Sequence, residues 1–285
     1  MSSYQDILYE VKDGVAVVTL SRPERLNAWR AEMEREVRQA MKAAAEDEAV
    51  RVIVLTGAGR GFCAGADMGG LQATSAASRG EGAAPAAARV RPGPFDPNSR
   101  SDFQKQYSYF PAVPKPIIAA INGACAGIGL AQALMCDLRF AAAGAKLTTS
   151  FARRGLIAEH GTSWLLPRLV GTARALDLLL SARVVLAEEA RELGLVNQVV
   201  PPEQLLPVAL DYARDLARNS SPTSMSVIKR QVLRHLDLSL DEALADSNAL
   251  MAQSLRRPDL AEGVASFVER RLPRFEPLQP DSTEA

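Results

Sequence analysis

The apolar and polar positions of this chain follow two different periods, which predict strands and helices in alternation. Residues 7–20 form two short apolar runs around the turn Lys12-Asp13-Gly14, as paired strands do. Residues 50–56 are a β-branched run that predicts a buried strand ending at a glycine-rich turn. Residues 30–45 carry apolar side chains at helical spacing, which predicts an amphipathic helix (Met33, Val37, Ala40 and Met41).

The same alternation continues in the middle of the chain. Residues 117–121 are an apolar run typical of a buried strand, residues 129–135 predict a helix after a glycine-rich turn, and residues 138–141 predict another strand. This order indicates an α/β fold. From Ala173 onward the pattern is mostly helical, and prolines divide it into segments (at 201–202, 222 and 258).

Residues 72–100 differ from both flanks because they are rich in Ala, Ser, Gly and Pro and contain few large apolar residues. Such a segment adds little to a core, so we predict a mobile surface insertion without apolar anchors. A linker between two domains is the alternative interpretation. The insertion is favoured because both flanks look like parts of one site.

Composition and charge narrow the class of protein. The chain has 285 residues, of which 47% are hydrophobic and 23% are charged, an ordinary globular balance. This length suffices for one large domain, or for one domain with an appendage. The formal net charge is +0, from 33 basic and 33 acidic residues. A neutral balance argues against a general nucleic-acid-binding surface, and we expect no nucleic-acid partner.

Cysteine and histidine are sparse in this chain. Cys63, Cys125 and Cys136 have no CxxC spacing, which argues against a disulfide framework or a zinc site and favours a reduced, cytoplasmic compartment. His160 and His235 stand far apart, so a histidine-based metal site has little support. The N-terminus has no apolar h-region and no apolar run reaches transmembrane length, so we expect no secretory signal and no membrane partner.

Three glycine-rich turns are candidates for chemistry. The turn at 57–62 superficially resembles a dinucleotide-binding turn, but Phe62 occupies the position of the third glycine and no strand ending in an acidic residue follows at the required distance. The turns at 63–67 and 123–129 can each direct backbone N–H groups outward. In the second turn the N–H of Ile128 would lie at the start of a helix, where an anion is favoured. Two such donors form an oxyanion hole if they converge, although tight turns and close packing explain the same glycines.

Glu159 is the candidate acid/base group. It lies in an apolar segment flanked by glycine, and its aromatic and aliphatic neighbours favour burial (Phe151, Leu156, Ile157 and Trp164). A carboxylate in such a place suits proton transfer. The alternative is a surface carboxylate, or one paired with a nearby arginine (Arg153, Arg154 or Arg168). His160 is interpreted as structural, because no nucleophile is present beside it.

Together these segments resemble the crotonase superfamily, that is, the enoyl-CoA hydratase/isomerase family. The resemblance covers nearly the whole chain apart from the insertion and the last few residues. It is carried by several ordered motifs (Arg22–Ala28, Gly61–Asp67, Lys115–Gly123, Cys136–Arg139, Gly155–Gly171 and Phe267–Arg271). The motifs are specific for the fold and much less specific for the reaction.

The resemblance implies a spiral of repeated ββα units over residues 1–200 and a helical oligomerisation region over residues 201–285. It also implies homotrimers, often paired into hexamers, and acyl-CoA thioesters as substrates. The backbone N–H groups of Ala66 and Ile128 would bind the thioester oxygen. The residues implied for coenzyme A lie in three places along the chain (Arg25 and Ala28; Ala64 and Asp67; Arg270 and Arg271, which could serve a neighbouring subunit).

The sequence departs from a typical hydratase of this family at two positions. Such enzymes carry two glutamates, and this chain has Ala131 and Phe151 in their places. Glu159 falls eight positions after Phe151, where dienoyl-CoA isomerases of the superfamily carry an aspartate. The ordinary two-glutamate hydration mechanism is therefore in doubt.

We predict an acyl-CoA-processing enzyme with an enolate-like intermediate. Hydration of a 2-enoyl-CoA to a 3-hydroxyacyl-CoA is the leading reaction, because it is the commonest assignment in the superfamily. Isomerisation of an enoyl-CoA or dienoyl-CoA, with Glu159 as the single acid/base, is the alternative. An acyl-CoA-binding protein with little turnover and an acyl-CoA hydrolase stay open. No cofactor is expected, because coenzyme A enters as part of the substrate.

Overall fold

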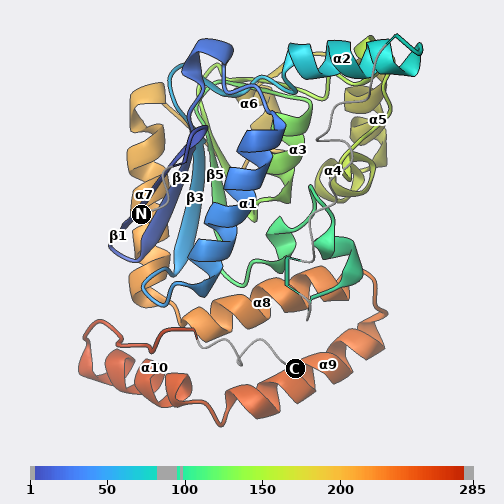
Figure 1. Ribbon diagram of the computed structural model, residues 1–285. Helices are drawn as coiled ribbons and strands as arrows, with labels where there is room; N and C mark the ends of the chain where they lie inside the picture. The colour runs from blue at the N-terminus through green and yellow to red at the C-terminus, as the bar shows by residue number, and fades with distance from the viewer. Residues whose placement is uncertain (1–3, 82–94, 97–98, 279–285) are drawn as a thin grey trace.

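A six-stranded sheet lies at the centre of the fold (Figure 1). The computed structural model describes residues 4–81, 95–96 and 99–278. Strands β1 and β2 form the predicted antiparallel hairpin, and the other neighbouring strands of this sheet run parallel. The strand order is β1 (Ile7–Lys12), β2 (Val15–Leu20), β3 (Val52–Gly57), β5 (Ile117–Ile121), β7 (Leu138–Ala142) and β10 (Gln198–Val200).

A second, smaller sheet consists of short strands that the sequence did not predict, in the order β4 (Gly61–Cys63), β6 (Ala124–Ala126), β8 (Lys146–Thr148) and β9 (Val185–Leu186). Three times, the chain leaves a strand of the large sheet, adds one strand to the small sheet and then forms a helix. These units are β3-β4-α2, β5-β6-α3 and β7-β8-α4. The predicted spiral of ββα repeats is therefore confirmed.

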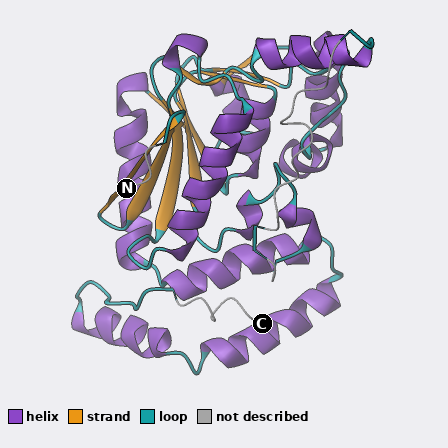
Figure 2. Ribbon diagram, in the orientation of Figure 1, coloured by secondary structure: helices purple, strands orange, loops and turns teal. Residues whose placement is uncertain are grey.

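Helices surround the large sheet (Figures 1 and 2). Helix α1, with the buried face that the spacing predicted, and helix α7 lie on opposite sides of the strands. Helix α7, which begins just after the predicted boundary at residue 200, packs on β2, β3, β5 and β7 and contributes buried residues to the core. The helices of this part are α1 (Ala31–Glu46), α2 (Met68–Ser78), α3 (Ile128–Met135), α4 (Thr162–Val170), α5 (Thr172–Ser181), α6 (Ala187–Glu192) and α7 (Leu205–Asn219).

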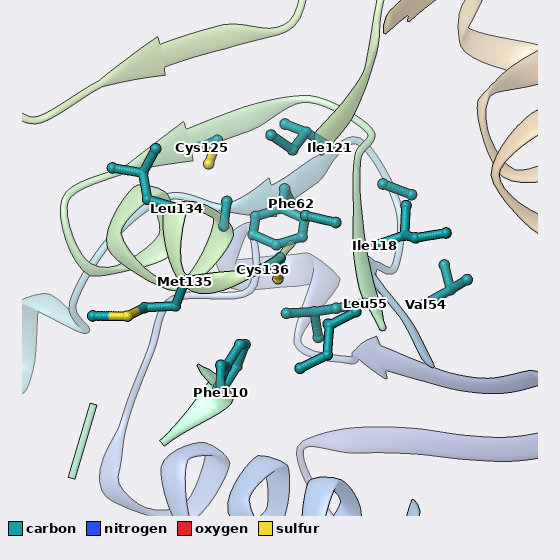
Figure 3. Close-up of a cluster of buried hydrophobic side chains, with 14 of the residues drawn as sticks. Val54, Leu55, Phe62, Phe110, Ile118, Ile121, Cys125, Leu134, Met135 and Cys136 are labelled. Atoms are coloured by element: carbon teal, nitrogen blue, oxygen red, sulfur yellow. The ribbon is translucent and has the colours of Figure 1, made fainter. Parts of the chain in front are cut away.

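The hydrophobic core joins the two sheets through α3. Figure 3 shows Phe62 of β4 in one cluster with side chains of β3, β5 and α3. Phe62 is fully buried. This packing fixes the small sheet and the start of α3 relative to the large sheet, which is what a site built from their turns requires.

Three further helices, α8 (Pro222–His235), α9 (Leu240–Ser254) and α10 (Pro258–Glu269), form a layer beyond one end of the strands (Figure 1). Pro222 and Pro258 begin α8 and α10, as the proline pattern predicted. Lys229 attaches α8 to the core by donating to the carbonyl oxygen of Lys115 at 3.1 Å and to the Asp137 carboxylate at 2.8 Å.

The segment predicted as an insertion is partly regular. Residues 72–78 belong to α2, while residues 82–94 and 97–98 lie outside the described residues. Phe95 is buried and stacks on Tyr109, with ring centroids 5.0 Å apart. The prediction that this segment has no apolar anchor was therefore wrong.

Candidate active site

The two glycine turns singled out in the sequence lie side by side. Strands β4 and β6 are parallel neighbours, with Cys63 opposite Cys125, so the turns that follow them emerge at the same edge of the small sheet. Gly65 and Gly127 have positive φ angles of 110° and 51°, which other residues rarely adopt. A Cβ atom on Gly127 would lie 3.9 Å from the Cα atom of Gly65. Each turn therefore favours glycine because of its φ angle, and the two turns lie close together.

The amide of Ala66 is held by its neighbours but does not bond to them. The N–H of Trp29 donates to the carbonyl oxygen of Gly65 at 2.8 Å, and the N–H of Asp67 donates to that of Trp29 at 2.9 Å. These bonds flank Ala66, so its own N–H points away from Trp29. Among the described residues, no hydrogen bond uses that N–H.

The second amide, that of Ile128, begins helix α3. Gly127 is the N-cap of this helix, and the first N–H groups of a helix have no partner within it. Gly129 presses the helix against β4, because a Cβ atom there would lie 2.4 Å from the carbonyl oxygen of Cys63. Two amide donors therefore sit on adjoining turns, in a framework that leaves little room to move.

The first two segments implied for coenzyme A also lie together. The N–H of Ala64 donates to the carbonyl oxygen of Leu26 at 3.0 Å, which joins the loop after β4 to the short 3₁₀ helix η1 (Pro23–Arg25). Arg25 is exposed, and its charge helps to lower the pKa of Asp67. The carbonyl oxygen of Ala28 accepts from Arg22 at 2.6 Å. Arg25 thus offers an exposed cation near the turn at 63–67.

Both carboxylate oxygens of Asp67 already have partners within the protein. It is the N-cap of α2, and its Oδ1 accepts from the N–H of Gly69 at 3.0 Å while its Oδ2 lies 3.1 Å from the Arg22 guanidinium. Burial raises the pKa of this carboxyl, but the Arg22 and Gly69 hydrogen bonds outweigh it and the pKa is lowered. Asp67 therefore stays ionised and holds the loop in shape.

The third segment implied for coenzyme A is not brought to this site within one chain. Arg270 and Arg271 follow α10, which lies at the opposite end of the molecule from α2 (Figure 1). The Arg271 guanidinium pairs with the Glu262 and Glu269 carboxylates.

Glu159 lies in the loop before α4, and the prediction that it is buried was wrong. Its side chain keeps 37% of its surface exposed, and Ile157, which was expected to cover it, is 80% exposed. The alternative pairing with an arginine is not present either. Arg153, Arg154 and Arg168 donate instead to backbone carbonyl oxygens, those of Ser181, Ser150 and Trp164.

Two side chains flank Glu159. The Nε2 atom of His160 lies 3.6 Å from a Glu159 carboxylate oxygen, but burial lowers the pKa of His160 to about 4, so the ring is neutral near pH 7 and forms no ion pair. Tyr107 meets His160 edge-on, with ring centroids 4.5 Å apart. Burial, followed by the charges of Glu34 and Glu159, raises the pKa of Tyr107 to about 12. One side of the Glu159 carboxylate is thus exposed to solvent, and the other side faces the neutral side chains of His160 and Tyr107.

A cavity of about 880 Å³ opens next to His160 and Gly161. Its walls come from residues 102–108, from α3 and α4, and from α8, and they are mostly apolar (Tyr107, Leu134, Met135, Trp164, Leu165 and Val232 among them). Its size is within the range of about 300–1,000 Å³ typical of small-molecule sites. The residues in the places of the two missing glutamates, Ala131 and Phe151, are both buried.

Trp29 and Glu34 also belong to the site, although neither was predicted from the sequence. Trp29 flanks the Ala66 turn, and Glu34 is a buried carboxyl group whose Oε2 accepts from the Trp29 Nε1–H at 3.1 Å. A signal was present, because Glu34 shares helical spacing with Val37 and Met41 and therefore falls on the buried face of α1.

Other kinds of site find no support in the described part of the chain. It contains no group of three metal-ligating side chains placed to hold an ion. Cys63, Cys125 and Cys136 are buried and unbridged. No helix within the described ranges is both long enough and apolar enough to cross a membrane.

Comparison with known proteins gives consistent matches. A family model described as enoyl-CoA hydratase/isomerase matches residues 10–278. The chain is 37% identical to the 1,2-epoxyphenylacetyl-CoA isomerase of Escherichia coli (strain K12), over 94% of this chain and 97% of that protein. A solved probable enoyl-CoA hydratase/isomerase from Mycobacterium abscessus has a TM-score of 0.81 and 34% identity, covering 95% of this chain and 99% of that one. A solved enoyl-CoA hydratase, EchA12_1 from Mycobacterium marinum, has 52% identity and a TM-score of 0.63, covering 80% and 97%.

Proposed function

This chain belongs to the enoyl-CoA hydratase/isomerase family, and from that premise we propose that it hydrates a 2-enoyl-CoA to a 3-hydroxyacyl-CoA. The observation that carries the proposal is the pair of amides on adjoining turns, with a water-exposed carboxylate in the loop before α4. Electrophilic activation of a thioester needs donors aimed at its oxygen, and proton transfer needs one group that can take and return a proton.

The Ala66 and Ile128 amides are proposed to bind the thioester oxygen. When a nucleophile adds at C3 of a 2-enoyl thioester, the electron pair of the double bond moves toward that oxygen and an enolate forms. Fixed N–H donors stabilise this charge more than they stabilise the neutral substrate, so they lower the barrier. The positive φ of Gly65 and the close packing of Gly129 support the idea that these donors are preorganised.

Glu159 is proposed to move the proton. As a carboxylate it takes a proton from water while the water oxygen bonds to C3, and as a carboxylic acid it returns that proton to C2 when the enolate collapses. The net change is the addition of one water molecule across the double bond. The exposed surface of Glu159 supports this role because water reaches the carboxylate, and the neutral His160 ring does not compete for the proton.

The substrate would be divided between two parts of the site. The apolar cavity beside His160 suits the acyl chain, since burying apolar surface contributes about 25 cal/mol per Å². The exposed cation of Arg25, beside Ala28 and Ala64, suits the phosphates of coenzyme A. Arg270 and Arg271 could add to this binding only from a neighbouring copy, because α10 lies at the far end of its own chain.

Isomerisation of an enoyl-CoA or dienoyl-CoA is the second candidate, and one observation favours it. Ala131 and Phe151 leave the site without the pair of glutamates that hydratases of the family carry, and a shift of a double bond needs only one acid/base group. In that reaction Glu159 would take a proton from one carbon and return it to another. The relative from Escherichia coli that is named an isomerase supports keeping this candidate.

The experiment is to incubate the protein with 2-enoyl-, 3-enoyl- and dienoyl-CoAs in D₂O and to identify the products by mass and position. A 3-hydroxyacyl-CoA with deuterium at C2 is the result expected for hydration. A shifted double bond that keeps part of the original hydrogen would assign isomerisation instead. Release of free coenzyme A would indicate hydrolysis. Tight binding of every thioester without any product would leave an acyl-CoA-binding protein.

We further propose that the chain assembles into a trimer or hexamer and works in the cytoplasm without a cofactor other than the coenzyme A of its substrate. Apolar side chains lie exposed along the C-terminal helices, and Phe267 of α10 is 85% exposed. So much apolar surface on one layer is typical of a subunit interface. Sedimentation as a monomer at micromolar concentration would contradict the assembly.

A further inference from the structure

The buried carboxyl group of Glu34 has no part in the mechanism above. It lies in the first turn of α1, on the face that packs into the core, and the residue is 5% exposed. A carboxyl group is seldom buried in this way unless it has a structural or chemical role, because removal from water disfavours its charged form. Its contacts indicate what that role is.

Glu34 reaches the Ala66 amide through one intermediate residue. Its Oε2 accepts from the Trp29 Nε1–H at 3.1 Å. The backbone of the same Trp29 donates to Gly65 and accepts from Asp67, the two residues on either side of Ala66. Trp29 is itself buried, so the surrounding side chains confine its indole. The side chain of one residue on α1 thus sets the position of the backbone that carries the first proposed oxyanion donor.

We propose that Glu34 is a positioning residue for the oxyanion hole, holding the Trp29 indole so that the Ala66 amide stays aimed at the thioester oxygen. The proposal rests on the proposed function, because it assumes that the Ala66 amide binds that oxygen. It adds a residue on α1 that the reaction itself does not touch. A donor displaced by about 1 Å can cost about 100-fold in rate, so the support matters.

Glu34 acts in its neutral form. The groups that face it are Arg38, one turn further along α1, and the phenols of Tyr107 and Tyr109. Burial raises the pKa of Glu34 to about 8, although the Trp29 hydrogen bond and the charge of Arg38 act in the opposite direction. The Oε1 atom has no hydrogen-bond partner among the described residues, which leaves it free to carry the proton. Above about pH 8 the carboxyl would ionise, and a charge buried in this place would disturb the packing around the indole.

Three variants test the proposal against a merely structural role. Glu34→Leu removes the acceptor, Glu34→Gln keeps a neutral acceptor for the indole, and Glu36→Leu is the matched control. Glu36 is equally buried on the same helix, but its carboxylate accepts from the backbone N–H groups of Gln5 and Asp6 and not from the Trp29 indole. Both leucine variants should lower thermal stability.

The expected result is that Glu34→Leu lowers kcat by about 10- to 100-fold and raises KM by a smaller factor, while Glu36→Leu leaves both unchanged. Glu34→Gln should restore most of kcat and remove the loss of activity that we expect of the wild type above about pH 8. Wild-type kcat in Glu34→Leu would overturn the proposal, and so would equal losses of kcat in the two leucine variants. An unaltered basic limb in Glu34→Gln would overturn the neutral form.

A binding measurement separates this proposal from the proposed function. If the wild type turns over no acyl-CoA, octanoyl-CoA and free coenzyme A serve as probes by calorimetry, because only the thioester carries the oxygen that Ala66 would hold. Glu34→Leu should then weaken octanoyl-CoA and leave coenzyme A unaffected. Equal affinities of octanoyl-CoA for the wild type and Glu34→Leu would overturn the positioning role.

Discussion

The two sides of the candidate site are built in opposite ways. On one side, the Ala66 and Ile128 amides are fixed by strand pairing, by a buried indole and by Gly129, where a side chain would collide with the Cys63 carbonyl oxygen. On the other side, Glu159 stands in a loop with 37% of its side chain exposed, next to a neutral histidine. Stabilisation of charge requires groups that are already in place, whereas proton exchange with water requires contact with water.

This contrast also separates the two glutamates near Tyr107. The charges of Glu34 and Glu159 both raise the pKa of Tyr107. Glu34, however, is buried and hydrogen-bonded, whereas Glu159 is partly exposed to solvent. We therefore assign support to Glu34 and proton transfer to Glu159. Substitutions on either side of the site test this division between a rigid side and a side that exchanges protons with water.

The largest effect is expected from removing one amide donor on the rigid side. Ile128→Pro deletes the N–H, and proline is accepted at the first position of a helix. Turnover should fall by about 10²–10³-fold, as it does when an oxyanion donor is lost. Ile128→Val is the control, since it keeps the N–H. A folded Ile128→Pro protein with the turnover of Ile128→Val would remove Ile128 from the site.

A smaller effect should come from loosening the packing behind that donor. Gly129→Ala places a Cβ atom where the Cys63 carbonyl oxygen lies 2.4 Å away, so the fold should lose about 1–3 kcal/mol. Gly70→Ala in α2 meets no atom within 4 Å and should be neutral or slightly stabilising. Thermal denaturation compares the two variants. Equal melting temperatures would show that the backbone around Gly129 and Cys63 adjusts to the added methyl group and is not rigid.

The third effect is spread over several pH units and comes from the buried carboxyl group of Glu34. Because the pKa of Glu34 is raised from 4.5 to about 8 in the folded state, the folded protein binds more protons than the unfolded chain between those values. The free energy of unfolding of the wild type should therefore fall as pH rises through this window, by at most about 1.4 kcal/mol per pH unit from this group.

Glu34→Gln lacks this dependence, so its melting temperature relative to the wild type should rise between about pH 5 and pH 8 and be level outside that range. Calorimetry at pH 4, 5, 6.5, 8 and 9 measures the difference. Two curves that run parallel across the whole range would mean that Glu34 is already ionised at neutral pH.

Much of the fold was predictable because long elements repeat their pattern. The hairpin around residues 12–14, the helix near residues 31–46 and the strand at residues 117–121 each bury a regular set of side chains. The strand Gly61–Cys63 was not predicted because three residues are too few to show the alternation of apolar and polar positions that marks a strand. The packing of α7 on the sheet was not predicted because its buried face consists mostly of small alanines, which do not distinguish it from any other helix.

The site was predictable only where backbone geometry requires a residue type. Gly65 and Gly127 stand at positive φ angles, and that requirement is visible in the sequence. The burial of Glu159 was predicted wrongly because apolar neighbours in a loop do not share a face, and Ile157 turns outward. The link from Glu34 to Trp29 was missed because it joins a helix side chain to an indole in the segment before that helix.

The central claim is that Glu159 moves the proton while two fixed amides hold the charge. Its most direct test is the kcat of Glu159→Gln on the best enoyl-CoA substrate, with Glu192→Gln on the exposed end of α6 as the matched control. General acid–base groups contribute about 10²–10⁴-fold, so Glu159→Gln should lose that much kcat while binding octanoyl-CoA as the wild type does. If Glu159→Gln turns over as fast as Glu192→Gln, Glu159 is not the acid/base group and the account is wrong.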